Sequence, residues 1–370
     1  MSGGKPNTEQ EMEVILGFVE EAEPWELRSP QFPSKVGGKP AWLGYRDVPS
    51  LPVLECDICQ LPMVFLLQVY APISGQERSF HRALFLFCCK TPECYSRNDG
   101  SCMKVFRSQL PRVNDFYPFD PPPDDGESSG SDHDQVVLPV TGVKLCWVCG
   151  CPGNKACSRC HNITYCSKHH QTLHWKHSHK KACGSQEASN DAASLILFPE
   201  FELATEPEEK DVEQEEDEVE EEVEEEENAE KEGALKTESG APLADALAEV
   251  DLEEMATHET QDNKVFQRFR RRTAAEPDQV LRYSRAGCPL WVSSQHVPSD
   301  HDIPSCTCGA KRSFEFQVMP QLLNSLRVDS TGASIDWGTL AVYSCSVSCN
   351  TEGYCREFLW KQDFSSEQQL

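Results

Sequence analysis

The residues with the clearest chemical signature are cysteines and histidines spaced as metal ligands. Between residues 146 and 183, two Cys-x2-Cys pairs are followed by a Cys-x3-His pair and a His-x3-Cys pair. Zinc takes four thiolate or imidazole ligands, and a two-residue gap lets one tight turn present both thiolates to the same ion. Three-residue gaps place ligands about one helical turn apart. Four such pairs suit two interleaved zinc sites, and we expect these ligands: Cys146, Cys149, Cys166 and His170 in site 1, and Cys157, Cys160, His179 and Cys183 in site 2.

Some alternatives stay open within this region. His169 competes with His170 for site 1, and Cys151, between the two knuckles, is expected to pack rather than bind. Both ions would have four protein ligands, so no coordination position remains for a water nucleophile and the sites would stabilise folding. The sequence also lacks a Gly-rich phosphate loop, a Gly-x-Ser-x-Gly elbow and a His-Glu-x-x-His motif. We therefore expect a protein that is not an enzyme.

Two further groups of four cysteines flank this region. Each has a close pair before one apolar run and a second pair after another run, the layout of a zinc ribbon in which two hairpin turns clamp the metal. The expected ligands are Cys56, Cys59, Cys89 and Cys94 in site 3, and Cys306, Cys308, Cys345 and Cys349 in site 4. Buried free thiols are the alternative at both sites. The one-residue gap between Cys306 and Cys308 is tighter than usual for a zinc knuckle.

The remaining cysteines have no evident partner set. Cys88 can substitute for Cys89, whereas Cys102, Cys288 and Cys355 are expected to be packing residues. A secretory signal is not evident near the start of the sequence, so we expect a reducing compartment in which these cysteines are thiols or metal ligands rather than disulfides.

The segments that carry sites 3 and 4 resemble two copies of one unit. An ungapped offset of 249 aligns two Gly-x-Pro-x-Trp segments together with several rarer residues, and an offset of 256 continues the alignment after a seven-residue insertion. The matches at 249 are residues 38–43 with 287–292, Cys59 with Cys308, Phe65 with Phe314, and Gln68-Val69 with Gln317-Val318; those at 256 are Leu84, Phe87 and Cys89 with Leu340, Tyr343 and Cys345. The Gly-x-Pro-x-Trp segments are interpreted as architecture rather than as a ligand pocket.

Short apolar runs within each copy have the length of strands. They span residues 63–70 and 83–87 in the first copy, and 314–319 and 340–343 in the second. We therefore expect a mostly β (α+β) fold, in which a duplicated β-rich body has zinc-ribbon-like sites and a small finger is inserted. The two copies can pack as one pseudo-symmetric body or form two separate small domains.

Composition divides the chain into five parts. Residues 118–143 are rich in Pro, Asp, Gly and Ser and form a linker, and residues 184–262 form a largely disordered acidic linker. The residues between Glu206 and Glu232 include 18 acidic and 2 basic ones, a large share of the formal net charge of −27. The expected folded parts are residues 10–117, 144–183 and 263–364. No stretch approaches 18 apolar residues, so we expect a soluble protein of the cytoplasm and nucleus without membrane contact.

The central region resembles the MYND finger, whose known fold is the interleaved, cross-braced one. The resemblance rests on the run from Tyr165 to Trp175 and on the ending from His179 to Cys183. It departs from the family at His170, a position that is often Cys. The resemblance implies a module that binds protein, in particular short Pro-rich peptides. The finger region has seven Lys or Arg and no Asp or Glu, so nucleic acid is a possible but less favoured partner.

The whole chain resembles the programmed cell death protein 2 family, which combines a MYND finger with two homologous flanking segments. The strings that carry this resemblance are residues 29–38, 306–312, 314–323 and 334–338. It implies a dedicated chaperone that captures a new, basic ribosomal protein of the small subunit and supports ribosome assembly, with effects on proliferation and apoptosis. The Glu-rich tract suits a basic client. The competing expectation is a nuclear DNA-binding or corepressor-type transcription regulator that acts through the finger, with residues 268–272 as a basic contact.

Overall fold

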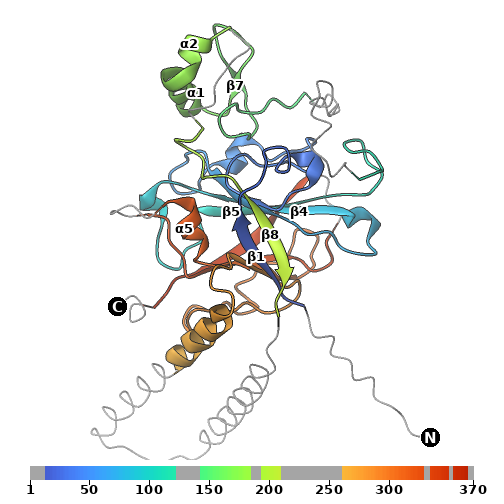
Figure 1. Cartoon of the computed structure of the whole chain (residues 1–370), viewed down its shortest axis with the longest axis vertical. Helices are drawn as coiled ribbons and strands as arrows, with labels where there is room; N and C mark the ends of the chain where they lie inside the picture. Colours follow the sequence, from blue (N-terminus) through green and yellow to red (C-terminus); the bar gives the residue numbers. More distant parts are fainter. Residues whose placement is uncertain are drawn as a thin grey trace, which may run out of the picture.

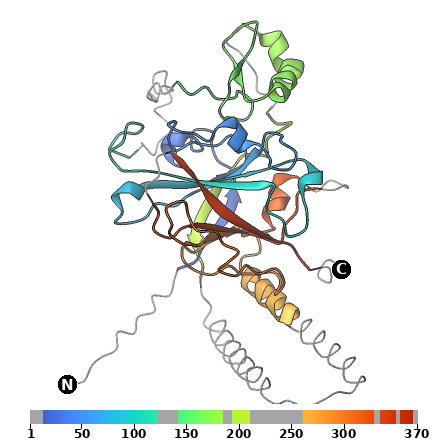
Figure 2. The same ribbon diagram turned by 180° about the vertical axis from the view of Figure 1, so that it is seen from behind.

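The protein is a closed β-barrel with a small finger at one end. The structure, a computed structural model, describes residues 13–121, 142–184, 193–209, 261–328, 334–349 and 353–365. In Figures 1 and 2 the finger projects beyond the barrel on one side, while the helical residues 261–274 lie at the opposite end. Within the described residues, no helix combines the length and the apolar character needed to cross a lipid bilayer.

Strands dominate the structure, and apart from the helical residues 261–274 the helices are short. The strands are β1 (Ile15–Glu20), β2 (Lys35–Val36), β3 (Val64–Tyr70), β4 (His81–Cys88), β5 (Met103–Leu110), β6 (Lys155–Ala156), β7 (Thr164–Tyr165), β8 (Phe201–Pro207), β9 (Leu281–Tyr283), β10 (Arg312–Val318), β11 (Thr339–Cys345) and β12 (Tyr354–Gln362). The α-helices are α1 (Lys168–His174), α2 (Lys180–Ala182) and α5 (Leu322–Leu326). One π-helical segment is η6 (Trp175–His179), and the 3-10 turns are η1 (Ser29–Gln31), η2 (Leu51–Leu54), η3 (Glu77–Ser79) and η4 (Pro92–Cys94).

The barrel joins the two sequence copies in one body. Its strand order is β1-β8-β2-β3-β4-β5-β12-β11-β10-β9, with β9 returning to β1. The four predicted apolar runs lie in β3, β4, β10 and β11, so the mostly β fold predicted from the sequence is confirmed. The two halves have the same order of elements and meet where β5 pairs with β12. The alternative of two separate small domains is therefore wrong.

The first strand of each half is exchanged with the other half. β1 precedes the first copy but pairs with β9 of the second, whereas β8 precedes the second copy and pairs with β2 of the first. β1 and β8 also pair with each other along six residues, side by side in Figure 1. The expected disordered linker, residues 184–262, therefore contains a barrel strand. Its apolar residues Phe201 and Leu203 stand beside glutamates, which hides the strand in the sequence, and residues 210–260 lie outside the described residues.

Matching details show that the halves are copies. In each, the register shifts at one residue of the long first hairpin: Leu66 in β3 has no register partner in β4, and Glu315 in β10 has none in β11. Gln68, buried, accepts from the Ala41 amide and donates to its carbonyl oxygen. Gln317 makes the same two bonds to Leu290. These glutamines hold the Gly-x-Pro-x-Trp segments against the sheet, which agrees with their interpretation as architecture.

Buried ion pairs cross between the halves. The Arg82 guanidinium on β4 makes a bidentate contact with Glu315 on β10, and both side chains are fully buried. Arg107 on β5 donates to Glu357 on β12 at 2.8 Å, and Glu357 also accepts from Arg312. Without its partner, each of these charges would be buried and uncompensated. The pairs therefore favour association of a first half with a second half over association of two identical halves.

The finger packs on the barrel. The indole Nε1 of Trp42, a fully buried residue of the first Gly-x-Pro-x-Trp segment, donates to the Gly150 carbonyl oxygen at 2.8 Å. The Lys39 ammonium lies 5.6 Å from the centroid of the Trp147 ring. Buried residues of the finger and the barrel form one continuous hydrophobic cluster. The finger is therefore oriented by the first half of the barrel.

Candidate metal centres

A common turn presents the first cysteine pair of three of the four candidate sites. In each, the carbonyl oxygen of the first cysteine accepts a hydrogen bond from the amide of the residue four positions later. This later residue has a positive φ. The three residues are Gln60 after Cys56, Gly150 after Cys146 and His161 after Cys157, with φ of 59°, 70° and 58°. The positive φ reverses the chain directly after the second cysteine, so that both Sγ atoms point to one side. This is the knuckle that a Cys-x2-Cys pair needs.

The fourth turn is the same knuckle shortened by one residue. The Cys306 carbonyl oxygen accepts the amide of Gly309, three residues later, and Gly309 has φ of 87°. Glycine adopts this conformation without a steric cost. The one-residue gap in Cys306-x-Cys308 is thus a tighter version of the other turns, and it still presents both sulfur atoms.

In the finger, the four ligand pairs interleave. The Sγ atom of Cys146 lies 3.6 Å from His170 Nδ1, and that of Cys149 lies 3.7 Å from Cys166 Sγ. His170 is buried at the start of α1, where its amide donates to the Ser167 hydroxyl, while His169 is exposed. The structure therefore places His170 and not His169 in site 1.

Site 2 joins the second knuckle to the end of the helical segment. Cys160 Sγ lies 3.5 Å from His179 Nε2, and Cys157 Sγ lies 3.3 Å from the same nitrogen. Cys183 Sγ is 4.0 Å from Cys157 Sγ. His179 ends the π-helical segment η6, and Cys183 directly follows α2. The wider π turn lies between His170 of site 1 and Cys183 of site 2, and it changes the rotation of the helical segment between these two ligands.

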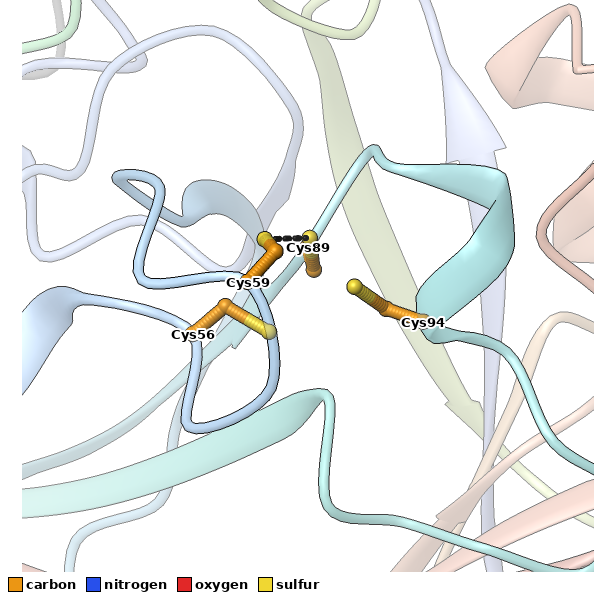
Figure 3. A group of neighbouring side chains, drawn as sticks. All are labelled: Cys56, Cys59, Cys89 and Cys94. Atoms are coloured by element: carbon orange, nitrogen blue, oxygen red, sulfur yellow. Dashed lines mark hydrogen bonds between the residues drawn. The ribbon is translucent and has the colours of Figure 1, made fainter.

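Site 3 is formed by two loops at one end of β3 and β4. Figure 3 shows that the four cysteine side chains converge from the knuckle at Cys56 and Cys59 and from the segment of Cys89 and Cys94. The Sγ atoms of Cys59 and Cys89 are 3.6 Å apart, and the Thr91 amide donates to Cys89 Sγ at 3.3 Å. Cys56, Cys89 and Cys94 are 1–2% exposed. The site is nearly sealed.

Site 4 occupies the equivalent place in the second half. The Sγ atoms of Cys306 and Cys349 are 3.6 Å apart, and those of Cys308 and Cys345 are 3.7 Å apart. Cys308 is exposed. The Arg107 guanidinium of the first half donates to Cys349 Sγ at 3.4 Å and to the Cys349 carbonyl oxygen at 3.2 Å. Site 4 is therefore connected to the ion pairs between β5 and β12.

The spacing of the donor atoms fits a tetrahedral metal ion. For zinc–sulfur bonds of about 2.3 Å, the edge of a tetrahedron is about 3.8 Å. The sulfur–sulfur distances of 3.6–4.0 Å bracket this edge and far exceed the roughly 2.05 Å of a disulfide. In each of the four sets, all donor atoms lie within 4.8 Å of one another. The four sets fit metal ions, and in the finger and the barrel alike every set supplies four protein ligands.

The pKa values in sites 3 and 4 show thiols that compete for negative charge. Burial raises the pKa of Cys59, but hydrogen bonds from the Leu61 amide, Thr91 and the neighbouring thiols outweigh burial and bring its pKa to about 7. Cys306 likewise reaches a pKa of about 7, since hydrogen bonds from Cys308 and Cys349 outweigh burial. Burial and the neighbouring sulfur atoms raise the pKa of Cys349 to about 12. Only a cation placed among the four sulfur atoms would let them ionise together.

The other cysteines are separate from these sets. Cys88, Cys102, Cys151 and Cys355 are buried. The expectation that Cys288 is a packing residue is wrong, because Cys288 is exposed. Burial raises the pKa of the Cys88 thiol. Sequence reasoning missed one contributor, the buried Arg107 that donates to Cys349, because an arginine 242 positions away has no spacing signal.

Comparisons with known proteins agree with this architecture. Family models match the N-terminal domain of programmed cell death protein 2 at residues 13–124, a MYND finger at 146–183 and the C-terminal putative domain of programmed cell death protein 2 at 263–363. Programmed cell death protein 2 of Bos taurus is 47% identical over 95% of this chain and 96% of that protein. Programmed cell death protein 2-like of Homo sapiens is 28% identical over 85% of each.

A more distant match comes from yeast. Probable 20S rRNA accumulation protein 4 of Schizosaccharomyces pombe is 33% identical over 98 residues, which is 24% of each chain. No solved structure matches this chain significantly.

Proposed function

Because this chain belongs to the programmed cell death protein 2 family, we propose that it is a zinc-stabilised carrier that captures a basic ribosomal protein of the small subunit. In this proposal it supports ribosome assembly in the cytoplasm and nucleus and is not an enzyme. The name of the yeast relative, which refers to accumulation of 20S rRNA, supports the link to ribosome assembly. The names of the other relatives refer to programmed cell death, and they support an effect on cell survival.

Zinc is the ion we propose for all four sets. Thiolate-rich tetrahedral sites suit zinc, and a set with four protein ligands leaves no position for a reacting water. The ligands are then Cys146, Cys149, Cys166 and His170; Cys157, Cys160, His179 and Cys183; Cys56, Cys59, Cys89 and Cys94; and Cys306, Cys308, Cys345 and Cys349. Bound zinc would crosslink loops and stabilise the fold. This role fits a protein that holds another polypeptide.

The observation that supports the choice of a basic client is the pair of glutamates Glu20 and Glu202 at one end of the β1–β8 ribbon. Glu20 and Glu202 stand directly opposite each other across the ladder, where like charges destabilise a sheet. Burial raises the pKa of Glu202, and the charges of Glu26 and Glu20 add to this shift. The half-buried ring of Phe18 lies two residues from Glu20 on β1 and therefore on the same face of the ribbon as the two glutamates. A basic segment with apolar side chains would relieve the repulsion and cover the Phe18 ring.

A capture experiment tests this function. The full chain, immobilised, is offered ribosomal proteins of the small subunit at low and at physiological salt. We expect retention of one basic protein, and a Glu20→Lys/Glu202→Lys double variant should slow its association at least tenfold at low salt. Asp300→Lys is the control, because Asp300 is an exposed acid that is paired with Lys311 and belongs to neither strand of the ribbon. Unchanged association of the double variant would remove the ribbon from the binding surface.

The same experiment separates the competing function. The finger carries seven basic residues and an exposed ring at Trp147, which suit nucleic acid or a Pro-rich peptide of a nuclear regulator. If a pull-down at moderate salt recovers nucleic acid or such a regulator and no ribosomal protein, the carrier function is overturned in favour of a nuclear regulator.

A further inference from the structure

The cysteines of sites 3 and 4 differ in their exposure to solvent. Of the nineteen cysteines, all within the described residues, two are exposed: Cys288, which belongs to no set, and Cys308 of site 4. The shortened knuckle places Cys308 at an open tip, since a Cβ atom built on the next residue, Gly309, would meet nothing within 4 Å. In site 3 the equivalent Cys59 is half-buried and its Sγ atom contacts the Thr91 hydroxyl.

We propose that site 4 is a peroxide-sensitive zinc site, in which Cys308 and Cys345 form a disulfide and the zinc ion is released. The proposal rests on zinc as the occupant of site 4, but not on the identity of any client. Access decides which zinc-bound thiolate a peroxide reaches first, because the thiolate is the nucleophile and must approach the peroxide oxygen. Cys345 Sγ lies 3.7 Å from Cys308 Sγ and is the sulfur atom placed to resolve the first product.

The chemistry balances with hydrogen peroxide as the oxidant. The Cys308 thiolate attacks one peroxide oxygen, the O–O bond breaks, and hydroxide leaves and takes a proton to become water. The resulting sulfenic acid is attacked by the Cys345 thiolate, which forms the S–S bond and expels a second hydroxide that also becomes water. Two electrons pass from the two sulfur atoms to the peroxide. Once Cys308 and Cys345 are joined, only Cys306 and Cys349 would remain as ligands, and the zinc ion would dissociate.

Loss of this ion reaches the contact between the two halves. Cys349 accepts hydrogen bonds from Arg107 of β5, and Arg107 also donates to Glu357 of β12. Cys345 is the last residue of β11, which pairs with β12. A disulfide at Cys345 and release of zinc from Cys349 therefore alter both sides of the β5–β12 pairing. The cysteines of site 3 are buried or half-buried, so peroxide reaches them more slowly and its zinc would be retained.

The test uses the zinc-loaded full chain and hydrogen peroxide. Zinc release is followed with a chromogenic chelator, native mass spectrometry counts the ions retained, and peptide mapping locates the first disulfide. We expect four ions before treatment, and loss of one ion at least tenfold faster than the others, together with a Cys308–Cys345 disulfide. Thiol reductant with added zinc should restore the fourth ion. Hydrogen exchange should increase in β12 when the first ion leaves.

Two variants sharpen the assignment. Cys308→Ser should remove the fast phase, whereas Cys59→Ser, the matched change in the first half, should leave the fast phase intact. If a variant does not fold, disulfide mapping of the natural chain still shows which two cysteines are oxidised first. A first disulfide within site 3 or the finger, or simultaneous loss of all ions, overturns the proposal. Zinc content restricted to the finger also overturns it, and leaves client capture to be judged by its own assay.

Discussion

The two halves of the barrel share one architecture but differ in what they bury. At the equivalent bulge the first half has Leu66 and the second has Glu315, which pairs with Arg82 across the barrel. The cysteines of the first set are buried or, at Cys59, half-buried, whereas the second set includes the exposed Cys308. The two copies therefore share one backbone arrangement, and individual substitutions set them apart. One substitution, at the bulge, provides an ion pair that forms only between a first and a second half. Another difference makes one cysteine set more accessible than its counterpart.

The largest expected effect comes from making the bulges alike. Glu315→Leu gives the second half the residue of the first and leaves the Arg82 guanidinium buried without its carboxylate. We expect unfolding in urea to show a loss of about 3–5 kcal/mol, the usual cost of breaking a buried pair. The double variant Arg82→Met/Glu315→Leu should recover most of that loss. A single variant as stable as the natural chain would contradict a role of this ion pair in joining the halves.

A smaller effect is expected at the paired tryptophans. Trp42 donates to the finger at Gly150, whereas its counterpart Trp291 packs against an apolar cluster of the second half that includes no finger residue. Trp42→Phe removes this hydrogen bond and leaves the Gly150 carbonyl oxygen unpaired, at a cost of about 1–2 kcal/mol. Hydrogen exchange at residues 146–150 should become faster.

Trp291→Phe is the control for this prediction. It removes an equivalent indole but touches no finger residue, so exchange in residues 146–150 should not change. Equal acceleration by both variants would mean that the finger responds to general loosening of the barrel rather than to its own anchor.

The smallest expected effect is a pH dependence of the free energy of unfolding that arises from a histidine of the first half only. The 256-residue offset places His81 where the second half has Trp337. Burial, with the nearby charge of Arg112, lowers the pKa of His81 to about 4. Because the unfolded chain has the higher histidine pKa, about 6.5, it binds the proton first, so this contribution to stability is present above that value and is lost as pH falls towards 4.

The measurement for His81 is a difference between two proteins. Urea unfolding at pH 7 and pH 5 should show that His81→Phe loses less stability on acidification than the natural chain, by about 1 kcal/mol or less. Acid release of metal affects both proteins and cancels in the comparison. The same loss in both proteins would exclude a buried neutral His81.

Local patterns in the sequence predict much of this structure. Apolar run length predicts β3, β4, β10 and β11, and ligand spacing groups the same four donor sets that the structure brings together. Both features depend on residues close in the chain. The exchange of β1 and β8 depends on pairing between distant segments, and β8 is only seven residues long among glutamates. Likewise, the pairing of Arg82 with Glu315 has no periodicity by which a single sequence reveals it.

The exchange of first strands has a consequence for synthesis. When the first half has left the ribosome, the neighbour that β2 needs, at residues 201–207, has not yet been made. β1 in turn must wait for β9 at residues 281–283, and β5 must wait for β12. The nascent chain therefore cannot finish folding one half before the other has emerged. Two separately produced fragments, divided after β8, should each be incomplete alone and should complement each other when mixed.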